Sequence, residues 1–163
     1  MAKVAAGLLL FRRGTQDPEV LLVHMGGPFW ARKDLGAWSI PKGEVLPGEE
    51  LLAGARREFR EETGLDPVGT PFALGQVKQS GGKVVHAWAL EGDFDPATLT
   101  SNMYSVEFPK GSGQFRDYPE VDRAEWFTLA EARRRVIPAQ APLLDVLEAA
   151  PQFRTAVGDS RPA

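Results

Sequence analysis

The segment Gly43–Leu65, GEVLPGEELLAGARREFREETGL, constrains the fold and chemistry of this chain more than any other part of it. Five residues separate Gly43 from Glu49, and seven more precede Arg57-Glu58. The segment then closes on the run EETGL. Its seven identities would coincide by chance on the order of 10⁻⁸ per starting position. A stable helix does not require glutamates and an arginine at this spacing, so we expect the segment to form a functional site.

The same segment predicts a helix that starts near Glu49, after Pro47-Gly48, and ends at Gly64. At about 100° per residue, the last three glutamates of the segment fall within an arc of about 100° beside the apolar face. These carboxylates crowd the last turns, where the helix dipole is already negative, at a cost of roughly a few tenths of a kcal/mol per unfavourable contact. A bound cation would reverse the sign of that cost.

The three clustered glutamates Glu58, Glu61 and Glu62, in a chain without cysteine, favour a hard divalent ion. Mg²⁺ takes oxygen ligands and keeps waters and substrate phosphates in its shell, so Mg²⁺ or Mn²⁺ suits this cluster better than zinc. The alternative interpretation is a solvated acidic face paired with arginines at helical spacing, such as Arg57 with Glu61. That alternative does not explain the fixed glycines Gly43 and Gly64.

At every fixed position the segment resembles the Nudix box, G-x5-E-x7-R-E-U-x-E-E-x-G-U, where U is a bulky apolar residue; Phe59 fills a U position that is more often aliphatic. The resemblance implies an α/β fold, a Nudix α/β/α sandwich with a mixed β-sheet. It predicts a single Nudix hydrolase domain over residues 1–150. The residues after it are small and polar and end near proline, so we expect a frayed tail over residues 151–163.

The resemblance also implies a reaction, the metal-dependent hydrolysis of a pyrophosphate bond in a nucleoside diphosphate linked to another moiety. By carry-over onto matching positions, Glu61 and Glu62 are the main metal ligands, Glu58 is a further ligand or the base, and the Gly43 carbonyl is another ligand. Glu49 and Arg57 are expected to form an ion pair that orients the loop and helix rather than to take part in chemistry.

Apolar runs on both sides of the box predict strands over residues 4–11, 19–25, 38–40, 71–78 and 83–90. The run Thr128-Leu129-Ala130-Glu131 fits a capping box that opens a helix, and a last helix is expected over residues 141–149. Residues 107–118 are polar and rich in glycine, and we expect a mobile segment near a site entrance. Strands and helices mix without strict alternation, as in a sheet between helices.

Outside the box, Glu120 is the candidate for a catalytic carboxylate, because it lies six residues before Trp126. Many Nudix proteins carry an acidic residue near such a tryptophan, where it reaches the metals or positions the water. A loop carboxylate without a partner is the alternative. Lys42, beside Gly43, either contacts phosphate or is exposed, and Trp30 either stacks a base or packs on the domain.

Lys78 is a weaker phosphate candidate, as are Lys83 and Arg116. His24 and His86 lie in apolar strands with no serine or second histidine at a spacing that supports catalysis, so both are expected to be structural.

The formal net charge of −3 argues against duplex nucleic acid or an anionic membrane as a partner, and no apolar run reaches membrane-spanning length. The start of the chain does not have the order of a signal peptide, so we expect a cytoplasmic protein whose partner is a small-molecule nucleotide or polyphosphate. Members of the resembled family are often dimers, which permits a homodimer, but no apolar stripe identifies an interface.

The substrate stays open at this stage. The run Trp38-Ser39-Ile40-Pro41-Lys42-Gly43 is similar to Nudix members that act on diadenosine polyphosphates, but the tyrosine that many of these carry beyond the box is missing. The proline of ADP-ribose pyrophosphatases is missing too. A catalytically silent nucleotide-binding module is the alternative function, although such modules usually lose a box glutamate and this chain keeps all of them.

Overall fold

A computed structural model describes residues 3–158. Its strands are β1 (Val4–Arg12), β2 (Glu19–Met25), β3 (Trp38–Ser39), β4 (Lys42–Glu44), β5 (Phe72–Lys78), β6 (Val84–Glu91), β7 (Met103–Glu107), β8 (Phe115–Pro119) and β9 (Val121–Thr128). Its α-helices are α1 (Leu51–Thr63), α2 (Leu129–Arg135), α3 (Ala141–Ala149) and α4 (Pro151–Ala156), with short 3₁₀ turns at Ser80–Gly82, Pro96–Thr98 and Pro138–Gln140.

Seven strands form one mixed sheet, in which β1 runs parallel to β6 and the other pairs are antiparallel. The path is β3-β2-β1-β6-β5, with β9 added on β2 and β4 on β1. β1 pairs with β2 only at Phe11 and Arg12, and β4 takes over the same edge from Ala5 to Gly7. This exchange of partners brings β4, which carries Gly43, to the middle of the sheet.

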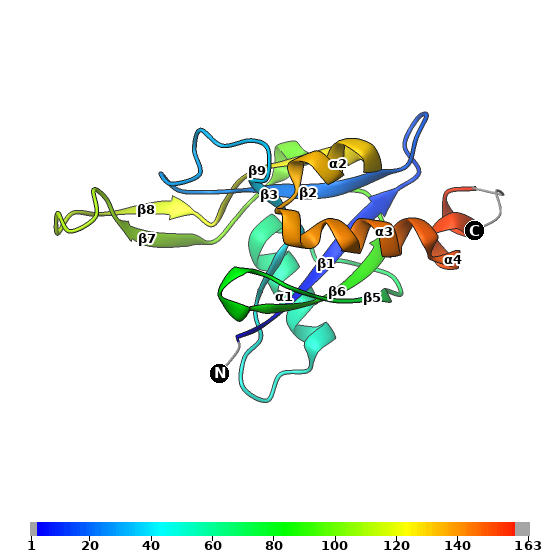
Figure 1. Ribbon diagram of the computed structural model, residues 1–163, viewed down its shortest axis with the longest axis horizontal. Coiled ribbons are helices and arrows are strands. Elements are labelled where there is room, and N and C mark those ends of the chain that lie inside the picture. Colours follow the sequence, from blue (N-terminus) through cyan, green and yellow to red (C-terminus); the bar gives the residue numbers. More distant parts are fainter. Residues whose placement is uncertain (1–2, 159–163) are drawn as a thin grey trace.

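Side chains of β1 alternate between two cores, because successive residues of a strand point to opposite faces. Leu8 and Leu10 pack with Phe59 of α1, whereas Leu9 and Phe11 pack with residues of α2, α3 and α4. Figure 1 shows α1 and α3 crossing the strands on opposite sides. Helices therefore cover both faces of a mixed sheet, which confirms the predicted α/β/α sandwich.

Helix α1 ends where the sequence predicts. Gly64 has a φ of 84°, in the left-handed region that favours glycine, and its N–H donates to the Arg60 carbonyl over 2.8 Å. The helix begins at Leu51, slightly later than predicted, with Glu50 at the N-cap and no side-chain cap. Phe59 is fully buried, so the apolar face anchors the helix to β1 and directs its acidic face to the edge of β4.

The prediction of a frayed tail over residues 151–163 is wrong for its first part. Residues Pro151–Ala156 form α4, and Phe153 is buried with its ring 5.1 Å from the ring of Phe11. A single apolar side chain at the right place outweighs the polar composition of the segment. Residues 159–163 of the predicted tail lie outside the described residues.

The segment predicted to be mobile over residues 107–118 contains the turn and most of the second strand of a hairpin. Strands β7 and β8 pair in register from Met103 with Pro119 to Glu107 with Phe115. Figure 1 shows this hairpin extending away from the sandwich, at the end opposite to α4. Its glycines lie in the connecting turn rather than in a long loop, with Gly111 and Gly113 at positive φ.

None of the helices between residues 3 and 158 has the length and apolar character that crossing a membrane requires.

Candidate active site

Arg57 is the centre of the hydrogen bonds that join the box helix to the preceding loop. Its guanidinium donates to both carboxylate oxygens of Glu49, over 2.9 and 3.1 Å, and to the Glu44 carbonyl over 2.9 Å. Such a paired contact is charge-assisted and fixes direction as well as distance. The Arg57 guanidinium, together with the Leu46 N–H, lowers the pKa of Glu49 to about 2. The loop and α1 are thereby held in one geometry.

The same guanidinium reaches the acidic face of the helix, where its Nη1 donates to Glu58 and to Glu61 over 2.9 Å each. Glu62 instead accepts from the Lys42 N–H over 3.0 Å. Glu58 and Glu62 are buried, at 9% and 7% exposed, whereas the Glu61 side chain is 35% exposed. The three box glutamates are therefore aligned along the junction of α1 and β4.

Burial without full charge compensation raises the pKa of three carboxyls. Burial raises the pKa of Glu62 to about 8, against the hydrogen bond and the charge of Lys42, and the charge of Glu120 adds to the rise. Burial also raises the pKa of Glu58, although Arg57 opposes this rise. Glu120 has a pKa raised by burial and by the charge of Glu61. Glu120, remote in sequence, thus lies in the electrostatic field of the box.

Gly43 lies where β4 comes close to the acidic face of α1. A Cβ built at this position would overlap the carboxylate of Glu58, the free end of a flexible side chain, so another residue here would displace that carboxylate. The glycine therefore lets the Glu58 carboxylate lie directly against the main chain of β4.

The donor set fits a hard divalent cation. The members that the sequence predicts are carboxylates and a backbone carbonyl, the oxygen ligands that Mg²⁺ and Mn²⁺ prefer. Burial and mutual repulsion disfavour the charge of Glu58, Glu62 and Glu120, and a cation would remove that penalty. As placed, no three acidic or histidine side chains within residues 3–158 enclose a metal position. Ligation by Glu58 and Glu61 would therefore require both side chains to turn from Arg57 toward the ion.

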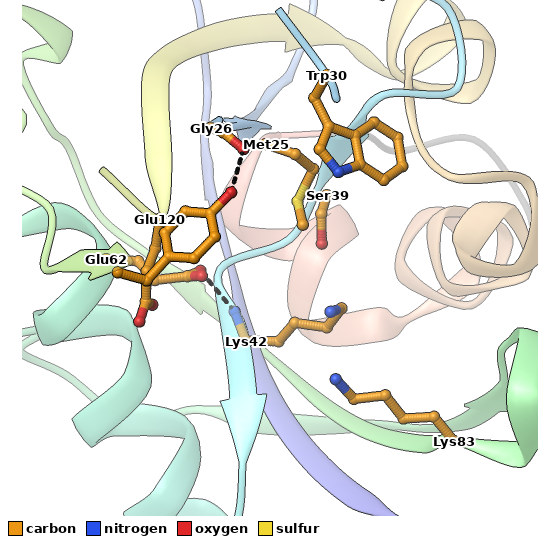
Figure 2. A pocket seen from close by; sticks show the side chains of 9 residues that line it. Met25, Gly26, Trp30, Ser39, Lys42, Glu62, Lys83 and Glu120 are labelled. Atoms are coloured by element: carbon orange, nitrogen blue, oxygen red, sulfur yellow. Dashed lines mark hydrogen bonds between the residues drawn. The ribbon is translucent and has the colours of Figure 1, made fainter. Parts of the chain in front are cut away.

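A cavity of about 310 Å³ opens beside this cluster. Its lining comprises Met25, Gly26, Trp30, Ser39, Lys42, Glu62, Lys83, Tyr104 and Glu120. Figure 2 shows the ammonium groups of Lys42 and Lys83 pointing toward one another on one side, with Glu62 and Glu120 on the other. The pKa of Lys42 is lowered, first by burial and then by the charge of Lys83. Two like charges in one cavity favour an anionic occupant.

The cavity distinguishes between the outlying sequence candidates. Lys42, Trp30 and Glu120 line it, whereas Lys78, at the end of β5, is not among its lining residues. Lys83, a candidate of the same standing as Lys78, does line it. The sequence analysis missed Met25, Ser39 and Tyr104. Ser39 precedes the box closely enough to have been considered, but nothing in the sequence places Tyr104 of the projecting hairpin near β4.

His24 has the structural role that its sequence context predicts. It is fully buried, with Nδ1 at 2.7 Å from Asp122 Oδ1 and Nε2 at 2.6 Å from the Lys33 carbonyl. Both ring nitrogens are thus occupied, and the residue ties the loop that carries Trp30 to strand β9.

Comparisons with known proteins identify the family of this domain. Residues 1–147 match the family model of the NUDIX domain. Nudix hydrolase 7 of Arabidopsis thaliana is 39% identical over 62 residues, which are 38% of this chain and 21% of that protein. The asymmetrical bis(5'-nucleosyl)-tetraphosphatase of Mus musculus is 40% identical over 72 residues, 40% of this chain and 45% of that protein. The matched region spans less than half of either relative.

Solved structures share the fold at low identity. The NUDIX domain of Shewanella oneidensis NrtR, complexed with ADP ribose, has a TM-score of 0.63 and 18% identity, over 91% of this chain and 87% of that one. A binary complex of C. elegans Ap4A hydrolase has a TM-score of 0.64 and 22% identity, over 89% and 96% of the two chains. With an unbroken box, a matching fold and a family model that covers most of its length, this chain belongs to the Nudix family.

Proposed function

We propose that this protein is a metal-dependent pyrophosphohydrolase whose substrate is a nucleoside or dinucleoside polyphosphate. The observation that carries the proposal is one cavity with carboxylates on one side and two lysine ammonium groups on the other. A pyrophosphate bridge between these sides would meet positive charge at Lys42 and Lys83. The relatives named for tetraphosphatase and Ap4A hydrolase activity support this class of substrate.

Glu61 and Glu62 are proposed as the main ligands of Mg²⁺ or Mn²⁺, with Glu58 and the Gly43 carbonyl completing the set. When bound, such an ion would neutralise charge on the phosphate oxygens and lower the pKa of a water molecule that it holds. Arg57 and Glu49 hold the loop and helix so that these oxygens keep their relative positions.

Hydrolysis requires a water oxygen to bond to phosphorus while the bridging P–O bond breaks and its electron pair leaves with the departing phosphate. A proton of the water must pass to a base. Glu120 is the proposed base or water-orienting group, because its raised pKa brings it closer to the neutral range in which a general base is most effective. Trp30 borders the cavity and is proposed to contact the base of the nucleotide.

Product release from nucleoside triphosphates, dinucleoside polyphosphates, ADP-ribose and diphosphoinositol phosphates, with Mg²⁺ or Mn²⁺ and with EDTA, tests the proposal. We expect cleavage of the nucleoside or dinucleoside polyphosphates that EDTA abolishes. Metal-dependent stabilisation by a nucleotide without any cleavage would replace the enzyme with a silent binding module.

The phosphate side of the cavity is tested with a matched pair of lysines. Lys83→Gln removes an ammonium group from the cavity and should raise KM about tenfold, by loss of a charge-assisted contact. Lys78→Gln removes the same charge outside the lining and should leave KM within about twofold. Equal effects of the two substitutions would show that the general field, rather than the cavity, binds the phosphates.

A further inference from the structure

The base of the β7–β8 hairpin joins three separate parts of the active site through main-chain hydrogen bonds. The Asn102 N–H donates to the Glu61 carbonyl of α1 over 3.0 Å, and the Asn102 carbonyl accepts from the Glu120 N–H over 2.8 Å. On its other side, the Glu120 carbonyl accepts from the Gly26 N–H over 2.9 Å. The peptide groups of Glu120 are therefore held between the box helix and the end of β2.

Regular strand pairing does not extend to Glu120. The β2–β9 register shifts after His24, so that His24 lies opposite Arg123 but Met25 lies opposite Val121. Such a bulge re-aims the side chains beside it and ends the regular ladder. The direction in which Glu120 points thus depends on the few contacts beyond the bulge, at Gly26 and Asn102.

Tyr104 closes this set of contacts. Its hydroxyl donates to the Gly26 carbonyl over 2.8 Å, so Gly26 is bonded at its N–H by Glu120 and at its carbonyl by Tyr104. The pKa of the Tyr104 hydroxyl is raised, first by burial and then by the charge of Glu120. The hydroxyl therefore keeps the proton that it donates to Gly26. Figure 2 marks this hydrogen bond by the dashed line that ends at Gly26, in the wall of the cavity.

The two glycines at the end of β2 make room for the hairpin. A Cβ at Gly26 would overlap the Pro119 carbonyl, and a Cβ at Gly27 would overlap the Tyr104 hydroxyl. Gly27 also has a φ of 96°, which a side chain would strain. The sequence therefore leaves the space that the tyrosine needs, and the hairpin is seated on the cavity by its base.

We propose that Tyr104 is a positioning residue that holds Glu120 over the box glutamates through the main chain of Gly26. The inference rests on the proposed function, since it assigns a purpose to the placement of Glu120. It also gives the β7–β8 hairpin a role in the reaction, because the hairpin delivers this hydroxyl from outside the sandwich. The alternative is that the tyrosine ring contacts the substrate directly as a wall of the cavity.

A double-mutant cycle separates these two roles. Tyr104→Phe keeps the ring and removes only the hydroxyl. We expect it to lower kcat about tenfold with KM changed less than about twofold, because a displaced Glu120 slows the chemical step without weakening substrate binding. In a Glu120→Gln background the same substitution should have no further effect. Tyr118→Phe is the matched control, because it lies opposite Tyr104 on the hairpin and no described residue hydrogen-bonds its hydroxyl.

Crystal structures of the parent protein and of Tyr104→Phe supply a readout that does not need activity. The proposal predicts a Glu120 carboxylate displaced from Glu61 and Glu62 in the variant. An unmoved Glu120, or an equal loss of kcat in both backgrounds, would overturn it. If the parent hydrolyses nothing in the substrate panel, the proposed function fails, whereas the position of Glu120 still decides the role of Tyr104.

Discussion

In α1 the guanidinium of Arg57 donates to Glu61 over 2.9 Å, and in α2 the guanidinium of Arg135 donates to Glu131 over 2.7 Å, so both helices pair an arginine with a glutamate one turn away. The two ion pairs differ in the charged groups that surround them. Arg134 also donates to Glu131, and the pKa of Glu131 is lowered, first by its hydrogen bond to Arg135.

Around Arg57 the balance of charge is the reverse. This single guanidinium serves Glu49, Glu58 and Glu61, and the pKa of Glu58 is raised by burial in spite of it. The same spacing of residue types thus neutralises charge on α2 and leaves an excess of negative charge on α1. Excess buried charge costs stability unless something else compensates it, which marks the α1 cluster as functional.

Removal of the excess negative charge on α1 should have the largest effect on kcat. Glu61→Gln together with Glu62→Gln should lower kcat by about 10³-fold or more, because both proposed metal ligands lose their charge. Without metal, the same double variant should unfold at a higher temperature than the parent, since buried like charges are removed. Glu131→Gln, which removes a compensated carboxylate, should keep kcat and slightly lower the unfolding temperature. Retained turnover in the double variant would disprove the metal assignment.

Glu120→Gln extends the comparison to the residue outside the box. We expect kcat to fall about 10²-fold or more with an unchanged circular dichroism spectrum, because a base or water-orienting group is lost while the shape is kept. Glu125→Gln, on the exposed face of β9, the strand that follows Glu120, is the control and should have near-normal kcat. Near-normal turnover of Glu120→Gln would remove Glu120 from the mechanism.

Arg57→Lys tests whether geometry or charge matters at the centre of the box. Lysine keeps the positive charge but cannot reproduce the paired hydrogen bonds to Glu49. We expect kcat to fall about tenfold through loss of orientation. The same substitution at Arg135 should leave kcat unchanged. Full activity of Arg57→Lys would mean that Arg57 serves only to reduce the acidic charge.

The pH dependence of unfolding should have opposite signs in the two regions. Glu62 has a folded-state pKa raised from 4.5 to about 8, so its favourable contribution is present below 4.5 and is lost as the pH rises through about 8. Glu131 has a lowered pKa, so its contribution is present above its usual range and is lost on acidification. In metal-free denaturant titrations, Glu62→Gln should gain stability over the parent as the pH rises. Parallel curves for the two proteins would contradict the raised pKa.

The sequence predicted those parts of the molecule whose cause is local. The glycine stop of α1 and the helix over residues 141–149 follow from short-range patterns. Glu120 could be proposed only through the resemblance to Nudix proteins that carry an acidic residue shortly before such a tryptophan, and in the structure it lines the same cavity as Glu62.

The parts that escaped prediction depend on contacts between distant segments. The helix of residues 151–156 forms around the burial of Phe153 against Phe11, which no local pattern reveals. Tyr104 reaches the cavity only because a projecting hairpin is seated on Gly26. The sequence named Lys78, Lys83 and Arg116 alike as weak phosphate candidates, and of these Lys83 lines the cavity. Composition did not identify Tyr104 and did not separate the three cations, since exposed tyrosines and lysines are common on any surface.

The most direct test of the central claim is the thermal unfolding of the metal-free protein at about pH 8, titrated with Mg²⁺ or Mn²⁺, for the parent and for the Glu61→Gln, Glu62→Gln double variant. We predict that the metal raises the unfolding temperature of the parent in a saturable way and leaves that of the double variant unchanged. An equal response of the two proteins, or none in the parent, would contradict the claim that the excess charge on α1 holds a divalent cation.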